Sequence, residues 1–112
     1  ISNLMPEFSC SLDTRPVTLV AKTVTKSTRV DGICVSGVMA GQAVQYEQLQ
    51  QVKEAVGEFP VIANTGVQFD TIAQILKIAD GCVAATCLKV DGKPQNRMDR
   101  ERVKKLVGAA QR

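Results

Sequence analysis

The sequence predicts a parallel α/β domain made of four strand–helix units. Short runs of small apolar residues alternate with segments whose apolar side chains recur at helical spacing, which is typical of a parallel sheet covered by helices. The predicted strands begin near positions 1, 33, 61 and 82, roughly the repeat length of an eight-unit barrel of about 250 residues. We therefore expect residues 1–112 to form a single (β/α)4 unit, one half of a TIM (β/α)8 barrel.

The first two units lie before residue 60. A short strand near 1–5 precedes a helix from about Pro16 to Ser27, because a proline suits the first position of a helix. The second strand is 33–36 (ICVS), and its helix runs from about 46 to 56, where glycine and proline follow. The apolar stripe of this helix consists of Leu49, Val52 and Val56.

The last two units follow the same pattern. The third strand is 61–63, with a helix that ends near Ala79, and the fourth strand is 82–85 (CVAA). The last helix begins after Asp99, whose carboxylate is a good N-cap. The inward stripes of the two helices are Ile72, Ile75, Leu76 and Ala79, and Val103, Leu106, Val107 and Ala110.

An open flavodoxin-like sheet with helices on both faces is the alternative fold, because both faces of each predicted strand are apolar or small. A half-barrel by itself would leave two unpaired strand edges and an uncovered inner face. The chain also opens on an apolar stretch (ISNLMPEF) without an initiator Met. We therefore expect a missing N-terminal half-barrel, or a second copy in a homo-oligomer, to complete the structure.

The composition argues against several functions. The chain has a net charge of +3, no histidine, and four cysteines that form no C-x-x-C pair, so we expect no metal and no cofactor. Cysteines within apolar runs indicate core residues in a reducing, cytoplasmic setting. The basic run 97–105 suits a solvated helix face better than a nucleic-acid site, and no apolar run is long enough to form a transmembrane segment.

The turn 64–67 (NTGV) is the leading candidate for a ligand site, because ligands of parallel α/β folds bind beyond the carboxyl ends of the strands. Asn64, Thr65 and Gly66 fall there; the glycine permits a close backbone approach, and a following helix would present free N–H groups to an anion. The same glycine also suits an ordinary strand-to-helix turn. Asp70, expected in the first helical turn, would repel a phosphate placed too near.

The next loop, 86–89 (TCLK), favours the anion interpretation. Thr86 supplies a hydroxyl and Lys89 an ammonium group, and barrels often share an anion site between the loops after their last two strands. Lys89 as a solvent-facing residue, or as a Schiff-base former with a lowered pKa, remains the alternative. Cys87 is a poor nucleophile candidate, since no histidine is present to activate it.

The other loops offer weaker candidates. Ser36 and Gly37 begin a glycine-containing loop that matches neither a P-loop nor a dinucleotide fingerprint but permits close approach to a ligand. Glu7 and Asp91 are possible acids or bases at the ligand end, with surface carboxylates as the alternative. The carboxylates that precede strands, and so belong to the opposite end, are Asp31 and Asp80.

Four segments in order and spacing resemble the BtpA family, and within it the SgcQ-like branch: 31–41 (DGICVSGVMAG), 61–67 (VIANTGV), 80–96 (DGCVAATCLKVDGKPQN) and 99–103 (DRERV). The resemblance implies a phosphate-binding TIM barrel of the ribulose-phosphate-binding type, of which this chain matches the C-terminal half only. It supplies no catalytic residues. The positions where such barrels hold an anion are Asn64, Thr65, Gly66, Thr86 and Lys89.

The resemblance also implies a function class. A full barrel would bind a small phosphorylated metabolite, either a sugar phosphate or a nucleotide, as a sugar-phosphate enzyme or a nucleotide hydrolase. We expect the chain alone to be inactive, because half of the ligand-end loops would be missing. One branch of the family is linked to photosystem I biogenesis, so a non-catalytic assembly factor is the alternative, and ligand-responsive regulation is a third interpretation.

Overall fold

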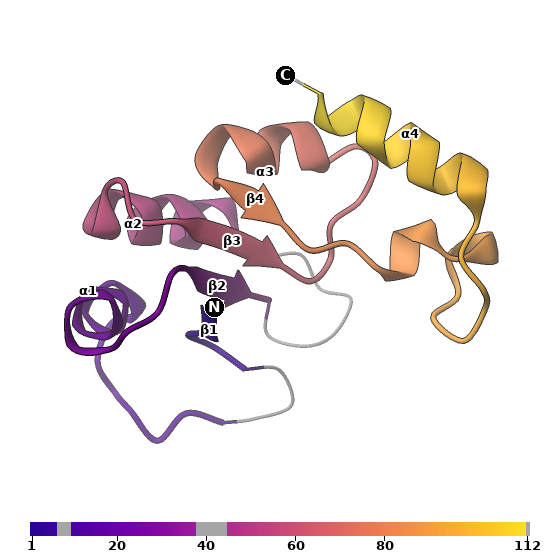
Figure 1. Cartoon of the computed structure of the whole chain (residues 1–112). Coiled ribbons are helices and arrows are strands. Elements are labelled where there is room, and N and C mark those ends of the chain that lie inside the picture. Colours follow the sequence, from indigo (N-terminus) through magenta and orange to yellow (C-terminus); the bar gives the residue numbers. More distant parts are fainter. Residues whose placement is uncertain (7–9, 38–44, 112) are drawn as a thin grey trace.

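The computed structural model describes residues 1–6, 10–37 and 45–111 of an α/β fold (Figure 1). Its strands are β1 (Ser2–Asn3), β2 (Ile33–Ser36), β3 (Val61–Asn64) and β4 (Gly81–Cys82). Its helices are α1 (Val17–Ser27), α2 (Tyr46–Val56), α3 (Ile72–Ile78) and α4 (Arg100–Ala110), with short 3-10 segments η1 (Thr86–Leu88) and η2 (Val90–Gly92) before α4. The predicted alternation of strands and helices is confirmed, and β2 and α2 have the bounds expected from the sequence.

The strands form one parallel sheet in the order β1-β2-β3-β4, so each strand pairs with the next one in the chain. The helices contact one another in the same order, α1 with α2, α2 with α3 and α3 with α4. Right-handed crossovers between successive neighbours place their helices on one face of a sheet, and Figure 1 shows the helices following one another along it. This arrangement is consistent with one half of a barrel or with an open sheet.

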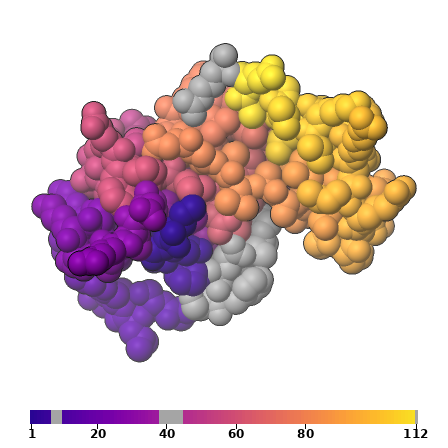
Figure 2. Space-filling model, viewed as in Figure 1, coloured from indigo at the N-terminus to yellow at the C-terminus, as the bar shows by residue number. Residues whose placement is uncertain are grey.

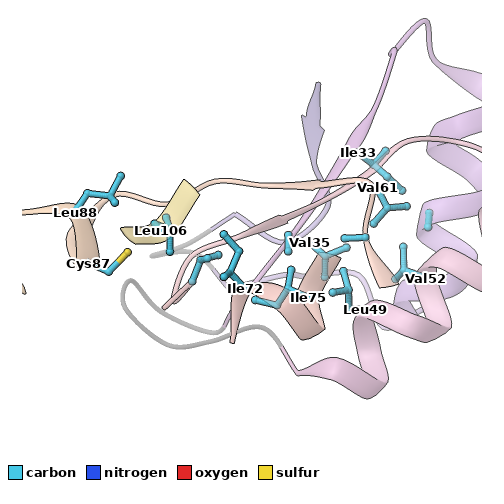
Figure 3. Close-up of a cluster of buried hydrophobic side chains, with 14 residues drawn as sticks. Ile33, Val35, Leu49, Val52, Val61, Ile72, Ile75, Cys87, Leu88 and Leu106 are labelled. Carbon is cyan, nitrogen blue, oxygen red and sulfur yellow. The ribbon is translucent and has the colours of Figure 1, made fainter. Parts of the chain in front are cut away.

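The register between β2 and β3 sorts their side chains onto two faces. Ile33 pairs with Val61, and Val35 pairs with Ala63. All four are fully buried and belong to the main hydrophobic cluster. The helices contribute Leu49, Val52, Ile72 and Ile75 to this cluster, which extends to Cys87, Leu88 and Leu106 (Figure 3).

The alternate residues of β2 and β3 point away from the helix layer, because successive side chains of a strand point to opposite faces. Cys34 pairs with Ile62, and Ser36 pairs with Asn64. The sheet face opposite the helices is therefore apolar in its middle and polar at the carboxyl ends of β2 and β3.

The ends of the helices follow from local chemistry. Asp99 caps α4 as predicted, since its Oδ1 accepts hydrogen bonds from the backbone N–H groups of Glu101 at 2.9 Å and Arg102 at 3.3 Å. The chain leaves α2 at Gly57, whose φ of 63° lies in the left-handed region that glycine adopts without strain.

Two predicted strands are too long. Strand 82–85 is reduced to Gly81–Cys82, because the N–H of Val83 makes a last bond to the carbonyl of Ala63 at 2.8 Å before the chain turns into η1. Strand 1–5 is reduced to Ser2–Asn3.

The predicted buried stripe of α4 is wrong at one position. Leu106 is buried, whereas Val107 is 55% exposed. Helix α4 packs against α3 and η1, and Val103 and Ala110 pack against the hydrophobic cluster while Val107 does not. In the third unit Ile72, Ile75 and Ala79 are buried as expected, and Leu76 is half-buried.

Exposed apolar side chains gather in the first and fourth units, which lie at opposite ends of the molecule (Figure 2). Ile1 is 74% exposed, Leu19 on α1 is 46% exposed and Val83 after β4 is 48% exposed. The large apolar residues exposed in the described part of the chain are Ile1, Leu12, Leu19, Val83, Met98 and Val107, and none of them belongs to the second or third unit.

The amino ends of the strands are tied together by Asp80, as its position before β4 predicts. Its Oδ2 accepts from the N–H of Val61 at 2.9 Å and from Nζ of Lys53 at 2.6 Å, and the same Nζ donates to the carbonyl of Phe59 at 3.2 Å. Partial burial acts to raise the pKa of Asp80, but the hydrogen bonds from Lys53 and Val61 outweigh it and leave the pKa lowered. Asp80 thus joins α2 to the start of β3.

We predict that Asp80→Asn destabilises the full-length protein by about 1 kcal/mol at pH 7, a modest value because the side chain is partly exposed to solvent. A carboxyl group whose folded pKa lies below its unfolded value stabilises above the unfolded value of about 4 and loses that effect as the pH falls through the folded pKa. Urea unfolding at pH 7 and pH 3 checks both points: the difference from wild type should shrink at pH 3.

Asp31→Asn is the matched control, because Asp31 also precedes a strand but is exposed and makes no hydrogen bond within the described residues. It should change the free energy of unfolding by less than about 0.5 kcal/mol. An equal loss in both variants, or a loss at Asp80 that is unchanged at pH 3, would contradict the assignment.

Candidate functional site

A chain of polar side chains crosses the sheet at the carboxyl ends of β1, β2 and β3. Nδ2 of Asn64 donates to Oγ of Ser36 at 3.1 Å, and Oγ of Ser36 donates to Oδ1 of Asn3 at 3.1 Å. Each of the three is the last residue of its strand. Ser36 is 1% exposed, so its hydroxyl is buried and fully engaged between the two amides.

A hydrogen bond joins the turn after β3 to the residue that follows β2. Oγ1 of Thr65 accepts a hydrogen bond from the N–H of Gly37 at 3.0 Å. Thr65 and Gly66 have φ angles of 66° and 67°, two successive residues in the left-handed region. This conformation costs nothing for glycine but is strained for a β-branched residue, and such strain is concentrated at functional sites.

Backbone donors are available in this turn. No hydrogen bond between residues of the described ranges uses the N–H groups of Gly66 and Val67. A main-chain N–H is a strong donor that nearly always has a partner, so two successive ones without an acceptor among residues 1–6, 10–37 and 45–111 suit an anion or a polar ligand group. Gly66 is half-exposed, which keeps the turn accessible.

The expected helix dipole does not reach this turn, which corrects the prediction. Helix α3 begins at Ile72, and Val67 to Thr71 separate it from Gly66. The N–H of Gln68 donates to Oγ1 of Thr71 at 3.0 Å, so this stretch forms its own turn. Asp70 is exposed and precedes the helix instead of lying in its first turn.

Thr86 and Lys89 lie on a separate loop that packs against α4. The N–H of Lys89 donates to the carbonyl of Thr86 at 3.1 Å, and Lys89 also pairs with Met98 in an antiparallel bridge. Nη1 of Arg102 holds the loop from α4 through the carbonyl of Cys87 at 3.1 Å. Hydrogen bonds therefore link Ser36, Gly37, Asn64 and Thr65 in one site, while Thr86 is exposed and Lys89 half-buried on the neighbouring loop.

A cation–π contact connects α4 to the segment after the turn. Nζ of Lys105 lies 4.7 Å from the ring centroid of Phe69, and the guanidinium carbon of Arg102 lies 5.9 Å from it. Because Arg102 also binds the loop 86–88, one side chain positions both loops of the predicted anion site relative to α4.

None of the candidate catalytic residues Glu7, Asp91 and Cys87 is placed in this hydrogen-bonded site by the described structure. Glu7 lies outside the described residues, as does most of the loop that follows Ser36 and Gly37. Asp91 is exposed in η2 with a φ of 56°. Burial raises the pKa of the Cys87 thiol, with smaller opposing contributions from a backbone hydrogen bond and from Arg102, so this group stays protonated and is no activated nucleophile.

Asn3 was not among the site residues predicted from the sequence. The signal was present, since Asn3 ends its strand in the same way as Asn64, but the predicted strand 1–5 placed it in the middle of the strand.

Leu4 and Met5, which follow Asn3, and Gly37, which follows Ser36, help to line a cavity of about 540 Å³ beside the carboxyl ends of β1 and β2. Val17 and Val20 of α1 form its apolar wall, and polar groups come from Gln48 of α2 and from the ion pair of Arg15 with Asp13.

The described residues contain no group of three or more His, Cys, Asp or Glu side chains arranged to hold a metal ion. In residues 1–6, 10–37 and 45–111, no helix has both the length and the apolarity needed to cross a membrane.

The fold and its site define a parallel α/β protein with a polar cluster at the carboxyl ends of adjacent strands. The chain belongs to the BtpA family, whose sequence model matches residues 1–112.

The chain is similar to several curated proteins. It is 39% identical over 105 residues to the sgc region protein SgcQ of Escherichia coli, covering 94% of this chain and 39% of SgcQ. It is 36% identical over 80 residues to an uncharacterized protein of Methanocaldococcus jannaschii, covering 71% of this chain and 30% of that protein. It is 32% identical over 79 residues to the photosystem I biogenesis protein BtpA of Synechocystis, covering 70% of this chain and 28% of BtpA.

The chain therefore spans well under half the length of the curated relatives it matches. No solved structure matches it significantly.

We predict that Thr65→Val destabilises the full-length protein by about 1–3 kcal/mol, because the buried N–H of Gly37 loses its acceptor while the shape of the side chain is kept. Thr65→Ser is the matched control: it keeps the hydroxyl, removes the β-branch from a left-handed residue, and should be at least as stable as wild type. Urea unfolding measures both variants. A stable valine variant together with a destabilised serine variant would contradict the role of the hydroxyl.

Proposed function

We propose that this chain binds the phosphate group of a small metabolite at the carboxyl ends of its strands. The observation that supports the proposal most directly is the turn after β3, where the N–H groups of Gly66 and Val67 have no acceptor among the described residues. Glycine at a φ of 67° lets a ligand approach the backbone closely. Asn64 and Thr65 add side-chain polar groups beside these N–H donors.

We further propose that Thr86 and Lys89 complete this phosphate site from the neighbouring loop. Lys89 offers a positive charge, and the loop is held near the β3 turn through Arg102, which binds Cys87 and lies over Phe69. The ligand then contacts two successive loops, as in barrels whose last two strands share an anion site. The metabolite class is a sugar phosphate or a nucleotide, and whether turnover follows binding depends on loops outside this chain.

The complete protein, in this proposal, is a TIM barrel of which this chain forms half. The sequential strand order and the single helix layer support it. The distribution of exposed apolar side chains supports it as well, because the first and fourth units expose Leu19, Val83 and Val107 where a barrel would add neighbours, while the two inner units expose no large apolar side chain among their described residues. The occupant we propose for these surfaces is the remainder of the same polypeptide.

We predict that the full-length protein binds phosphate, sugar phosphates or nucleotides in calorimetric titrations. Gly66→Asp together with Lys89→Ala should weaken binding at least about tenfold, because a negative charge replaces the open cradle and a positive charge is removed. Binding that survives both substitutions would rule out the proposed site. A protein partner that co-purifies stably, without any small-molecule binding, would instead favour an assembly factor.

Matched controls come from the same chain. Gly57→Asp changes a glycine with nearly the same φ, 63°, at a place where an added Cβ meets no atom within 4 Å and which lies at the amino ends of the strands. Lys93→Ala removes an exposed lysine from the loop that precedes α4. Neither should change the affinity for phosphate.

We predict that the 112-residue chain alone self-associates, because its outer units expose apolar side chains and its edge strands β1 and β4 each pair on one side only within the part of the chain that the structure describes. Gel filtration with light scattering at micromolar concentration should show a species larger than a monomer. Leu19→Glu with Val107→Glu should shift it toward the monomer. A well-folded wild-type monomer would defeat this expectation.

A further inference from the structure

A single backbone N–H group sets the direction of each hydrogen bond among the side chains of Asn3, Ser36 and Asn64. The N–H of Met5 donates to Oδ1 of Asn3 at 3.1 Å. Because a backbone N–H can only donate, the atom of the Asn3 amide that faces it must be the oxygen. The hydroxyl of Ser36 also donates to that oxygen, at 3.1 Å.

The remaining directions follow from this one. A serine hydroxyl carries one proton, and Ser36 donates it in the hydrogen bond to Oδ1 of Asn3. In its contact with Asn64, whose Nδ2 lies 3.1 Å away, the hydroxyl oxygen of Ser36 must therefore accept. Oδ1 of Asn3 has two lone pairs, and both are used. Nδ2 of Asn3 therefore carries two N–H donors in a fixed direction, and they make no hydrogen bond within the described residues.

We propose that Asn3 is a ligand-binding residue, which donates from Nδ2 to an oxygen on the carbon skeleton of the ligand. The inference rests on the proposed function, because it takes the phosphate to lie at the turn of Gly66 and asks what the neighbouring strands contact. The chemical class is a phosphorylated compound that also carries a hydroxyl, carbonyl or carboxylate oxygen. Ser36 is a positioning residue, since it holds both amides without facing the ligand itself.

The surroundings of Asn3 suit this role. Asn3 is half-buried, so its donors are reachable yet held in place. Its side chain lies on the same face of the sheet as those of Ser36 and Asn64, at the carboxyl ends of the strands. Asn64 is followed directly by the turn of Thr65 and Gly66, where the phosphate is proposed to bind.

Asn3→Asp separates a ligand-binding role from a structural one. A carboxylate keeps an acceptor for the N–H of Met5 and for the hydroxyl of Ser36, while an acceptor oxygen replaces the Nδ2 donors. In calorimetry on the full-length protein, Asn3→Asp should weaken D-ribose 5-phosphate and 3-phosphoglycerate at least about tenfold. Inorganic phosphate should change by less than about threefold. Ser2→Asp, which adds the same charge one residue away on the opposite face of β1, should leave all three affinities unchanged.

A measurement on the wild-type protein complements the variant. In a ¹⁵N–¹H spectrum, the side-chain NH₂ resonances of Asn3 should shift when D-ribose 5-phosphate is added and stay in place when inorganic phosphate is added. This result does not depend on whether Asn3→Asp folds, and resonances that stay in place with both compounds would overturn the inference.

The outcomes separate the two proposals when D-ribose and glycerate are added to the panel. If phosphorylated compounds bind and Asn3→Asp leaves every affinity unchanged, the role of Asn3 is overturned and the phosphate site stands. If only the unphosphorylated compounds bind, and Asn3→Asp weakens them, the role of Asn3 stands and the phosphate site falls. If none of the five compounds binds the wild-type protein, both are overturned.

Discussion

The strands Ile33–Ser36 and Val61–Asn64 lie side by side in a single parallel register, and both the core and the candidate site depend on it. The register places Val35 beside Ala63 on the face toward the helices, where both are fully buried. It also places Ser36 beside Asn64 on the opposite face, where the hydroxyl and the amide bind each other. A slip of one residue would exchange the two faces, burying polar groups in the core.

The two ends of the sheet differ in the polar contacts that they hold. At the amino ends, Asp80 bonds to the N–H of Val61 and to Lys53, which ties β3, β4 and α2 together. At the carboxyl ends, Asn3, Ser36 and Asn64 bond to one another, and Thr65 is held in a strained conformation. In barrels of parallel strands, residues at the amino ends serve stability and residues at the carboxyl ends carry the ligand chemistry.

The four units are unequal in how well they are covered. The inner strands β2 and β3 have neighbours on both sides, whereas β1 and β4 lie at the edges and are only two residues long. Large apolar side chains are exposed only in the outer units of the described chain. Burying one such side chain stabilises a protein by about 1.5–3 kcal/mol. The chain spans well under half the length of the curated relatives it matches.

The sequence by itself determined the alternation of strands and helices, the bounds of β2 and α2, the cap at Asp99 and the place of the turn at Gly66. These features depend on local periodicity, on capping chemistry and on glycine, all of which are readable within a few residues. Only the tertiary structure decided that Asn3 joins Ser36 and Asn64, because this contact needs three strands in register. It also decided that Val107 is exposed and that β4 ends at Cys82, since burial and pairing depend on which neighbours are present and not on the spacing of apolar residues along the chain.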